Sequence, residues 1–182
     1  MQISNTDLSG VMQVEPKVFE DERGFFFESY QKRLFEENNI SLEFVQDNHS
    51  RSKQGALRGL HYQIRQPQGK LVRVILGKIY DVAVDLRRYS STFGQWTGLY
   101  LSAENKKQLY IPPGFAHGFY VVSAWAEVLY KATDYYAPQW ERTLLWNDVQ
   151  LNVSWPLLEG KPPLLSPKDA AGTPFDRAEV YE

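Results

Sequence analysis

The sequence predicts an all-β protein, a jelly-roll barrel or sandwich with a few short helices. Three observations support this fold class: about nine short apolar stretches recur at regular spacing, turn residues separate them, and only one segment has a helical pattern longer than a turn. The clearest stretch is 79–86, whose period of two is typical of a strand with one face on a core. In it Tyr80, Val82, Val84 and Leu86 alternate with Asp81, Ala83 and Asp85.

The N-terminal part, residues 11–28, is expected to form a hairpin. Residues 11–19 favour two extended pieces, because Pro16 interrupts them. Residues 21–24 have the composition of a turn, and they lead into the apolar strand 25–28.

A brief helix is expected next, from Tyr30 to about Asn38, with Ser29 as its cap. The barrel itself is predicted over residues 44–153, and strand signals follow one another along it. The expected strands are 44–50, 57–64, 71–76, 79–86, 96–102, 108–111, 118–122 and 127–133.

The last part of the chain, residues 154–182, is rich in proline and glycine and is expected to lie over the barrel as coil. One turn of helix is predicted near Ser166–Asp169, because Pro167 suits the first helical position. No linker or repeat divides the sequence, so residues 1–182 are predicted to form a single domain.

Composition excludes several classes of function. The 182 residues carry 20 Lys and Arg against 22 Asp and Glu, a formal net charge of −2, with both signs interspersed. We therefore expect no nucleic-acid partner, since such proteins present a basic face. Residues 1–7 lack the features of a signal peptide and no apolar run is long enough for a membrane, so a cytoplasmic protein is expected. The absence of cysteine fits a reducing compartment.

The run 56–63 places an arginine and a histidine inside a predicted strand, as Arg58 and His61. Histidine is the usual proton acceptor near neutral pH, and the chain has only two others, His49 and His117. An ordinary strand histidine beside a surface arginine is the alternative. Strict alternation places Arg58 and His61 on opposite faces, and a bulge at Gly59 would bring them to the same face.

The segment from Pro112 to His117 has the spacing P-x-G-x-x-H. This spacing recurs in cupins, so the sequence resembles that of a cupin-like jelly-roll barrel, the double-stranded β-helix. Metal-binding cupins have further ligands on an earlier strand, but here Tyr62 and Gln63 follow His61. Two histidines alone make a poor site, so no metal is predicted.

Four motifs in order carry a more specific resemblance: residues 46–50, 58–63, 113–119 and 130–136. From about Val11 to Asp169 the sequence resembles the dTDP-4-dehydrorhamnose 3,5-epimerase family. The resemblance implies an isomerase that needs no cofactor. Such an enzyme inverts C3 and C5 of dTDP-4-dehydro-6-deoxy-D-glucose through enolate intermediates, which yields dTDP-4-dehydro-L-rhamnose for dTDP-L-rhamnose biosynthesis.

The resemblance also implies catalytic roles. His61 matches the base, Asp169 its carboxylate partner, Tyr130 the proton donor on the opposite face, and Lys70 the cation that faces the ketone oxygen. These residue types suit the chemistry, because inverting a carbon beside a ketone requires a base, an acid and a charge that stabilises the enolate. Each residue also has an ordinary explanation: Asp169 can complete a capping box with Ser166, Tyr130 can pack in the core, and Lys70 can be solvated.

For the nucleotide, the residues that match the family's pattern are Arg23, Glu28, Gln46, Asp47, Asn48, Arg58, His117, Tyr136, Glu141 and Lys168. Of these, Arg23, Arg58 and Lys168 suit the diphosphate, and the resemblance implies that Tyr136 stacks on thymine. It also implies a homodimer with exchanged N-terminal strands. Gln46 and Asn48 share one strand face by parity, which supports a joint role at the base edge.

Three alternatives remain open from the sequence. The chain could be a related dTDP-4-keto-sugar epimerase acting at one carbon, or a ketoisomerase. It could instead be a carbohydrate-binding jelly-roll module without catalysis, in which His61 would be dispensable. The third alternative is a metal-dependent cupin oxygenase.

Overall fold

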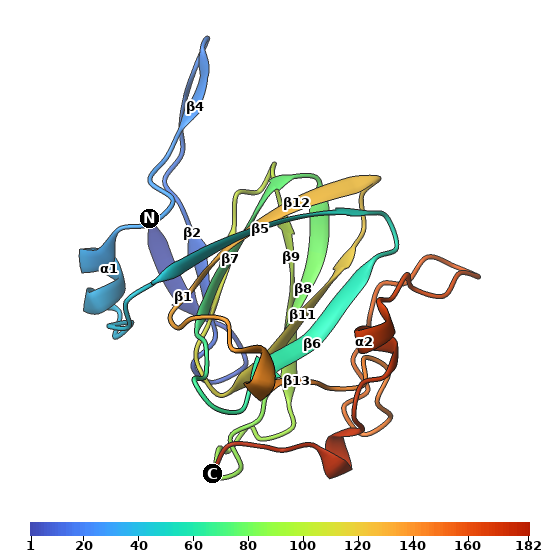
Figure 1. Ribbon diagram of the computed structural model, residues 1–182. Coiled ribbons are helices and arrows are strands. Elements are labelled where there is room, and N and C mark those ends of the chain that lie inside the picture. Colours follow the sequence, from blue (N-terminus) through green and yellow to red (C-terminus); the bar gives the residue numbers. More distant parts are fainter.

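Two antiparallel sheets face each other across the centre of the molecule (Figure 1). The computed structural model describes residues 1–182. The six-stranded sheet has the order β1 (Gln2–Asn5), β2 (Met12–Glu15), β10 (Gln108–Ile111), β7 (Lys70–Leu76), β12 (Trp125–Ala132) and β5 (Gln46–Lys53). The five-stranded sheet has the order β13 (Glu141–Thr143), β6 (Leu57–Gln63), β11 (Phe115–Val121), β8 (Lys78–Asp85) and β9 (Trp96–Ser102). The predicted all-β class is confirmed.

The remaining elements are short. A separate hairpin pairs β3 (Phe19–Asp21) with β4 (Gly24–Phe26). The helices are α1 (Lys32–Glu37) and α2 (Pro167–Ala170), with 3₁₀ turns η1 (Pro138–Trp140) and η2 (Phe175–Arg177). No helix in the structure has the length and apolar character that crossing a membrane requires.

The predicted strands agree best in the middle of the chain, where β9 and β10 have the bounds expected from the sequence. The strand expected from Gly118 begins earlier, at Phe115. Gly118 lies inside the strand because β6 passes very close to it: a Cβ there would be 2.6 Å from the Arg58 carbonyl oxygen. The glycine marks a close approach of two backbones and not the start of a strand.

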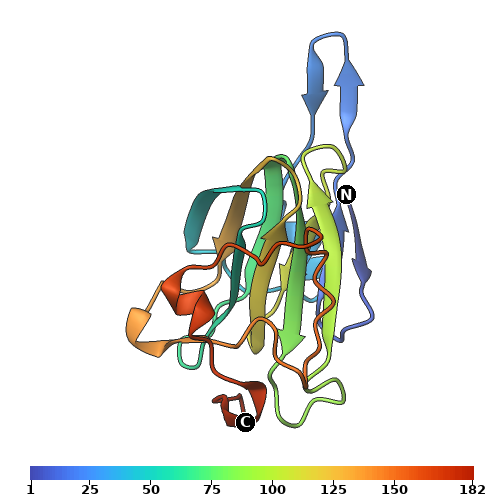
Figure 2. The same ribbon diagram turned by 90° about the vertical axis from the view of Figure 1, so that its right-hand side faces the viewer.

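The N-terminal prediction was wrong in its extent. Residues 12–15 do not join the hairpin, because they form β2, which pairs instead with β1 and β10 in the six-stranded sheet and buries Val14. Only β3 and β4 form the hairpin, which projects away from the barrel (Figures 1 and 2). The helix also begins later than expected, with Gln31 at its N-cap, while the Ser29 carbonyl accepts a hydrogen bond from Gln108 Nε2 at 2.8 Å.

Strand β8 is buried on both faces, which corrects the prediction of one core face and one polar face. Ile79 and Ala83 pack in the core between the sheets. Val82 and Val84 face the other way, but the C-terminal segment covers them, as Figure 2 shows. The apparent polar face, which includes Asp81, is thus the inside of the barrel.

The residues that follow β13 form this second core, and residues 154–182 are mostly coil. Leu144, Leu151 and Phe175 are buried against the outer face of the five-stranded sheet. The predicted helical turn is also confirmed: α2 begins with Pro167, and the Ser166 hydroxyl caps it.

We expect Phe175→Ala to lower the free energy of unfolding by about 3 kcal/mol, because it leaves a cavity in the core beneath the tail. Urea denaturation measures this change. Val149→Ala is the control, since Val149 is 93% exposed and should change stability little. Equal stability of both variants would mean that the tail contributes little to folding.

Candidate active site

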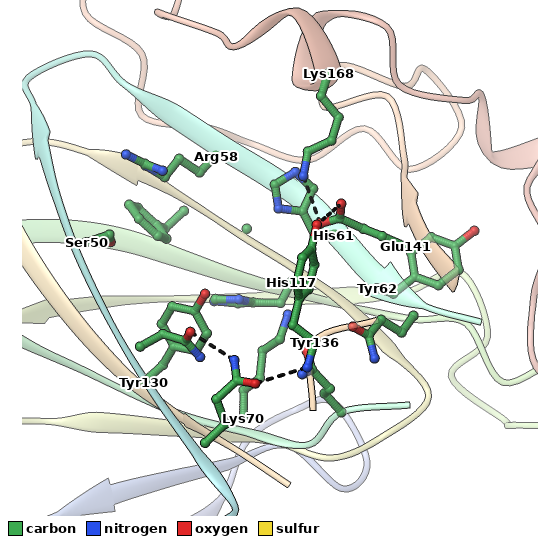
Figure 3. Close-up of a pocket in the computed structure, with 16 residues that line it drawn as sticks. Ser50, Arg58, His61, Tyr62, Lys70, His117, Tyr130, Tyr136, Glu141 and Lys168 are labelled. Carbon is green, nitrogen blue, oxygen red and sulfur yellow. Dashed lines mark hydrogen bonds and ion pairs between the residues drawn. The ribbon is translucent and has the colours of Figure 1, made fainter. Parts of the chain in front are cut away.

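An open pocket of about 380 Å³ lies between the two sheets, and most of the predicted site residues line it (Figure 3). One wall comes from the five-stranded sheet and the other from the six-stranded sheet. The predicted residues in its lining are Gln46, Asn48, Arg58, His61, Lys70, His117, Tyr130, Tyr136, Glu141 and Lys168.

His61 of β6 is bonded to Asp169 of α2, with 2.6 Å between His61 Nε2 and Asp169 Oδ1. The same carboxylate accepts hydrogen bonds from the Ser166 hydroxyl at 2.6 Å and the Gly59 amide at 3.2 Å. In return the Asp169 amide donates to Ser166 Oγ at 3.2 Å. Asp169 therefore takes part in capping the helix and in holding His61, so both interpretations of its position apply.

Burial leaves the imidazole neutral beside an ionised carboxylate. Burial alone would raise the pKa of Asp169, but hydrogen bonds from His61, Ser166 and Gly59 outweigh it and lower the pKa to about 2. Because an ionised carboxylate only accepts hydrogen bonds, Nε2 carries the His61 proton and Nδ1 keeps a free lone pair. Burial lowers the pKa of His61 below its usual 6.5, against the attraction of Asp169. His61 can thus act as a base at neutral pH.

A bulge in β6 brings Arg58 and His61 to the same pocket. Phe119 pairs with Arg58 and His117 pairs with His61, so three steps along β6 match two along β11. Gly59 has a φ of +121°, and a Cβ there would be 2.5 Å from Gly118 Cα. The predicted bulge is confirmed, and it explains how a strand delivers both side chains to one ligand.

Lys70 and Tyr130 stand on the opposite wall, on the neighbouring strands β7 and β12. Burial lowers the pKa of Lys70 to about 8, although Asp81 and Glu141 attract its charge. Burial also raises the pKa of the Tyr130 phenol. At neutral pH the pocket therefore contains an ammonium and a protonated phenol, facing a neutral imidazole.

His117 is buried and bonded to Asp81, with 2.7 Å between His117 Nε2 and Asp81 Oδ1. Asp81 was missed in the sequence, because its face of β8 was taken as the polar face. A carboxylate between apolar neighbours on both faces of a strand is the signal that could have indicated it. Ser50, on the pocket wall, was also missed, and its Oγ is buried without a hydrogen-bond partner in the protein.

Gln46 and Asn48 share the inner face of β5, and Gln46 Nε2 donates to Asn48 Oδ1 at 3.0 Å. Asp47 lies between them on the outer face, where its Oδ1 is 3.0 Å from the Lys131 ammonium. The alternation of a strand explains this placement, and the structure does not bring Asp47 to the pocket.

Tyr136, Glu141 and Lys168 form a chain of hydrogen bonds at the mouth of the pocket. The Tyr136 hydroxyl donates to Glu141 Oε2 at 3.0 Å, and Lys168 Nζ donates to Glu141 Oε1 at 2.8 Å. The Tyr136 residue is 54% exposed. A fixed aromatic ring that faces solvent is a suitable surface on which a flat group can stack.

Besides Asp47, the predicted residues Arg23 and Glu28 lie outside the pocket of their own chain. Arg23 is at the turn between β3 and β4, with its side chain 86% exposed and paired with Asp21. Glu28 follows the hairpin and does not line the cavity either. The structure of one chain therefore does not unite Arg23 and Glu28 with His61.

The donors in this pocket do not make a metal centre, since no group of three or more His, Cys, Asp and Glu side chains is arranged to hold an ion. A neutral imidazole, a protonated phenol and an ammonium instead surround one cavity. This arrangement, on a two-sheet barrel with cations and an exposed aromatic ring at its mouth, defines an isomerase that acts next to a carbonyl in an anionic ligand.

Comparison with known proteins makes the class specific. Residues 5–177 match the model of the family described as dTDP-4-dehydrorhamnose 3,5-epimerase. The chain is 58% identical over 182 residues to the enzyme of that name from Pseudomonas aeruginosa, covering all of this chain and 99% of that protein. This chain belongs to the dTDP-4-dehydrorhamnose 3,5-epimerase family.

Solved structures support the same family and confirm the cupin-like jelly-roll fold. The dTDP-6-deoxy-D-glucose-3,5-epimerase of Legionella pneumophila, in complex with dTDP-4-keto-L-rhamnose, has a TM-score of 0.94 and 54% identity, covering 98% of this chain and 94% of that one. The Mycobacterium tuberculosis epimerase has a TM-score of 0.92 and 36% identity, covering 97% and 89% of the two chains.

We expect a bell-shaped pH dependence of kcat/KM, since this parameter reports the groups of the free enzyme. The acid limb follows protonation of His61, whose pKa lies below 6.5, and the alkaline limb follows loss of the Lys70 charge near pH 8. Initial rates from pH 5 to 10 measure the profile. In Lys70→Arg the alkaline limb should move beyond the measured range, because guanidinium stays charged. An unchanged limb in that variant would assign it to another group.

Proposed function

We propose that this chain inverts C3 and C5 of dTDP-4-dehydro-6-deoxy-D-glucose to give dTDP-4-dehydro-L-rhamnose, as a step in dTDP-L-rhamnose biosynthesis. One observation carries the proposal: His61 and Tyr130 enter the pocket from opposite sheets. A sugar ring between the sheets would meet a base on one face and an acid on the other. This is the arrangement that inversion of a carbon requires.

Each inversion proceeds by two proton transfers. His61 Nδ1 removes the proton from the carbon beside the C4 ketone, and the electrons of the broken C–H bond form an enolate. Lys70 carries the positive charge that stabilises the enolate oxygen. Tyr130 then donates its phenolic proton to the other face of the carbon, after which His61 gives its proton to solvent and Tyr130 regains one.

Asp169 makes the base effective without receiving the proton itself. It fixes the tautomer that leaves Nδ1 free, and it stabilises the imidazolium that forms. No redox change or electron sink is needed for these steps, so the protein's own side chains suffice and we propose that no cofactor takes part.

The nucleotide would occupy the mouth of the pocket. Arg58 and Lys168 supply positive charge for the diphosphate, and Tyr136 offers its exposed ring to the thymine. Gln46 and Asn48, joined through their amides, face the same space and suit the edge of the base. We also propose a cytoplasmic location, which the absence of cysteine supports.

We further propose a homodimer in which the N-terminal hairpins are exchanged. The β3–β4 hairpin pairs with neither sheet of its own barrel, and Phe19, Phe25 and Phe26 on it are 54%, 60% and 67% exposed. Rings exposed to this extent on a projecting hairpin are suited to burial against another chain. Two-fold exchange would bring Arg23 and Glu28 to the partner's pocket.

We expect His61→Ala and Tyr130→Phe to separate the two proton transfers in deuterated water. His61→Ala should lose both deuterium exchange and inversion by about 10² to 10⁴-fold, the usual loss of a general base. Tyr130→Phe should still exchange at C3 or C5 while inversion falls sharply. Proton NMR of the sugar at both carbons measures exchange and product together. If Tyr130→Phe lost both to the same extent, its role as the donor would be wrong.

We expect mixed subunits to complement one another if the hairpins are exchanged. Arg23→Ala mixed with His61→Ala should recover about a quarter of wild-type activity, because half the dimers are mixed and each has one intact site. Activity after joint refolding measures the rescue.

The control is His61→Ala mixed with Tyr130→Phe, which alter the same pocket of one chain and should give no rescue. Absence of rescue in the Arg23 mixture, with dimers present by light scattering, would show that Arg23 serves its own chain.

A further inference from the structure

Glutamine side chains hold the backbone of four consecutive residues in the loop that carries Tyr136. These glutamines come from β5, from β6 and from the segment before β7, which are separate parts of the chain. Gln68 Nε2 donates to Asp134 O at 2.8 Å, Gln63 Nε2 to Tyr135 O at 3.2 Å, the Tyr136 amide to Gln46 Oε1 at 3.0 Å, and the Ala137 amide to Gln63 Oε1 at 2.8 Å.

Gln63 is the centre of this arrangement. It is only 4% exposed, and its Nε2 also donates to the Gln66 carbonyl at 2.7 Å. Both ends of its amide are therefore used within the protein, which fixes the orientation of the side chain. An apolar residue at this position would leave the carbonyls of Gln66 and Tyr135 and the buried amide of Ala137 without their partner in the protein.

The position of Gln63 connects the loop to the catalytic base. It follows His61 by two residues on β6, so both side chains point to the same side of the strand. Both also line the pocket. Strand β6, which carries His61, thus also holds the loop in its position beside the pocket.

The loop gains little from apolar burial, because Tyr135 and Tyr136 are 63% and 54% exposed. Hydrogen bonds position Tyr136 instead: Gln46 accepts from its amide and Glu141 accepts from its hydroxyl. An exposed ring held in one place before a ligand arrives lowers the entropy cost of stacking on it.

We infer that Gln63 and Gln68 are positioning residues that hold Tyr136 ready for the nucleobase. This inference rests on the proposed stacking of Tyr136 on thymine. Neither glutamine needs to touch the nucleotide, because each acts through the backbone of residues 134–137. Their effect should therefore fall on recognition of the base and not on proton transfer at the sugar.

The test compares Gln63→Leu and Gln68→Leu with the wild-type protein, using dTDP and inorganic pyrophosphate as calorimetric probes. We expect Gln63→Leu to weaken dTDP about tenfold, within the range that base stacking on an aromatic ring supplies. The affinity for pyrophosphate should be unchanged, KM should rise, and kcat should stay within about threefold, since the proton-transfer groups are intact.

Gln54→Leu is the matched control. Gln54 also donates one hydrogen bond to a backbone carbonyl, that of Val122 at 2.7 Å, but it does not line the pocket. Its dTDP affinity should equal that of the wild type. Equal losses for dTDP and pyrophosphate in Gln63→Leu would indicate general disruption and overturn the inference. If Gln63→Leu does not fold, Gln68→Leu decides, and unchanged dTDP affinity there overturns the inference.

A double-mutant cycle with Tyr136→Leu tests whether Gln63 affects dTDP affinity through Tyr136. If Gln63 acts through Tyr136, then Gln63→Leu should cause no further loss of dTDP affinity in the Tyr136→Leu protein. A full further loss would overturn the inference. If Tyr136→Leu alone keeps wild-type dTDP affinity, the proposed stacking fails and the inference with it. Epimerase activity, assayed separately, then shows whether the proposed reaction still stands.

Discussion

The carboxylate of Asp169 is the contact on which most of this structure depends. It lies 108 residues from His61 in sequence, yet it bonds the imidazole, the Ser166 hydroxyl and the Gly59 amide at once. The tail is thereby attached to the barrel at the point where β6 bulges.

Because the pKa of Asp169 falls from 3.8 to about 2 on folding, its ionised form stabilises the protein above pH 4, and that contribution is lost as pH falls toward 2. The shift corresponds to on the order of 2 kcal/mol, a large share of a typical net stability. The tautomer of the base and the position of the tail therefore depend on the same charge.

Much of the barrel could be predicted from the sequence, because the signals involved are local. Short apolar stretches and the turn residues at each end were enough for β9 and β10, whose bounds agree with the prediction. The bulge was also predictable, since Arg58 and His61 could share a ligand only if Gly59 shifted the register. The resemblance predicted which residues gather in the pocket, because it matches residues on strands that are distant in sequence to one family site.

The parts that were not predicted depend on contacts between distant segments. The sequence of β8 does not show whether solvent or the tail covers the outer face of the strand. Asp81 was therefore assigned to the wrong environment. The short strand β13 lies at a sheet edge and forms through its partner β6, which is distant in sequence. The first half of the predicted hairpin joined the sheet for the same reason, because pairing with β10 buries Val14. Asp47 is a case in which the resemblance gave a wrong placement and the local pattern gave the right one. Strand parity places Asp47 outside the pocket, although it stands between two pocket residues.

The two ends of the pocket are built in different ways, and this difference suits the proposed reaction. Proton transfer needs groups fixed to within a fraction of an ångström, and His61, Lys70 and Tyr130 all stand on central strands of packed sheets. The nucleotide end instead relies on an exposed loop held by glutamine amides. A substrate bound by its nucleotide there is anchored far from the reacting carbons, and remote binding energy of this kind can be used to orient the sugar between the two sheets. The loop must therefore be ordered before the substrate arrives, since a mobile platform would consume that energy in becoming ordered. Hydrogen bonds with glutamine amides meet this need where apolar packing cannot, because the ring that meets the nucleobase has to remain exposed.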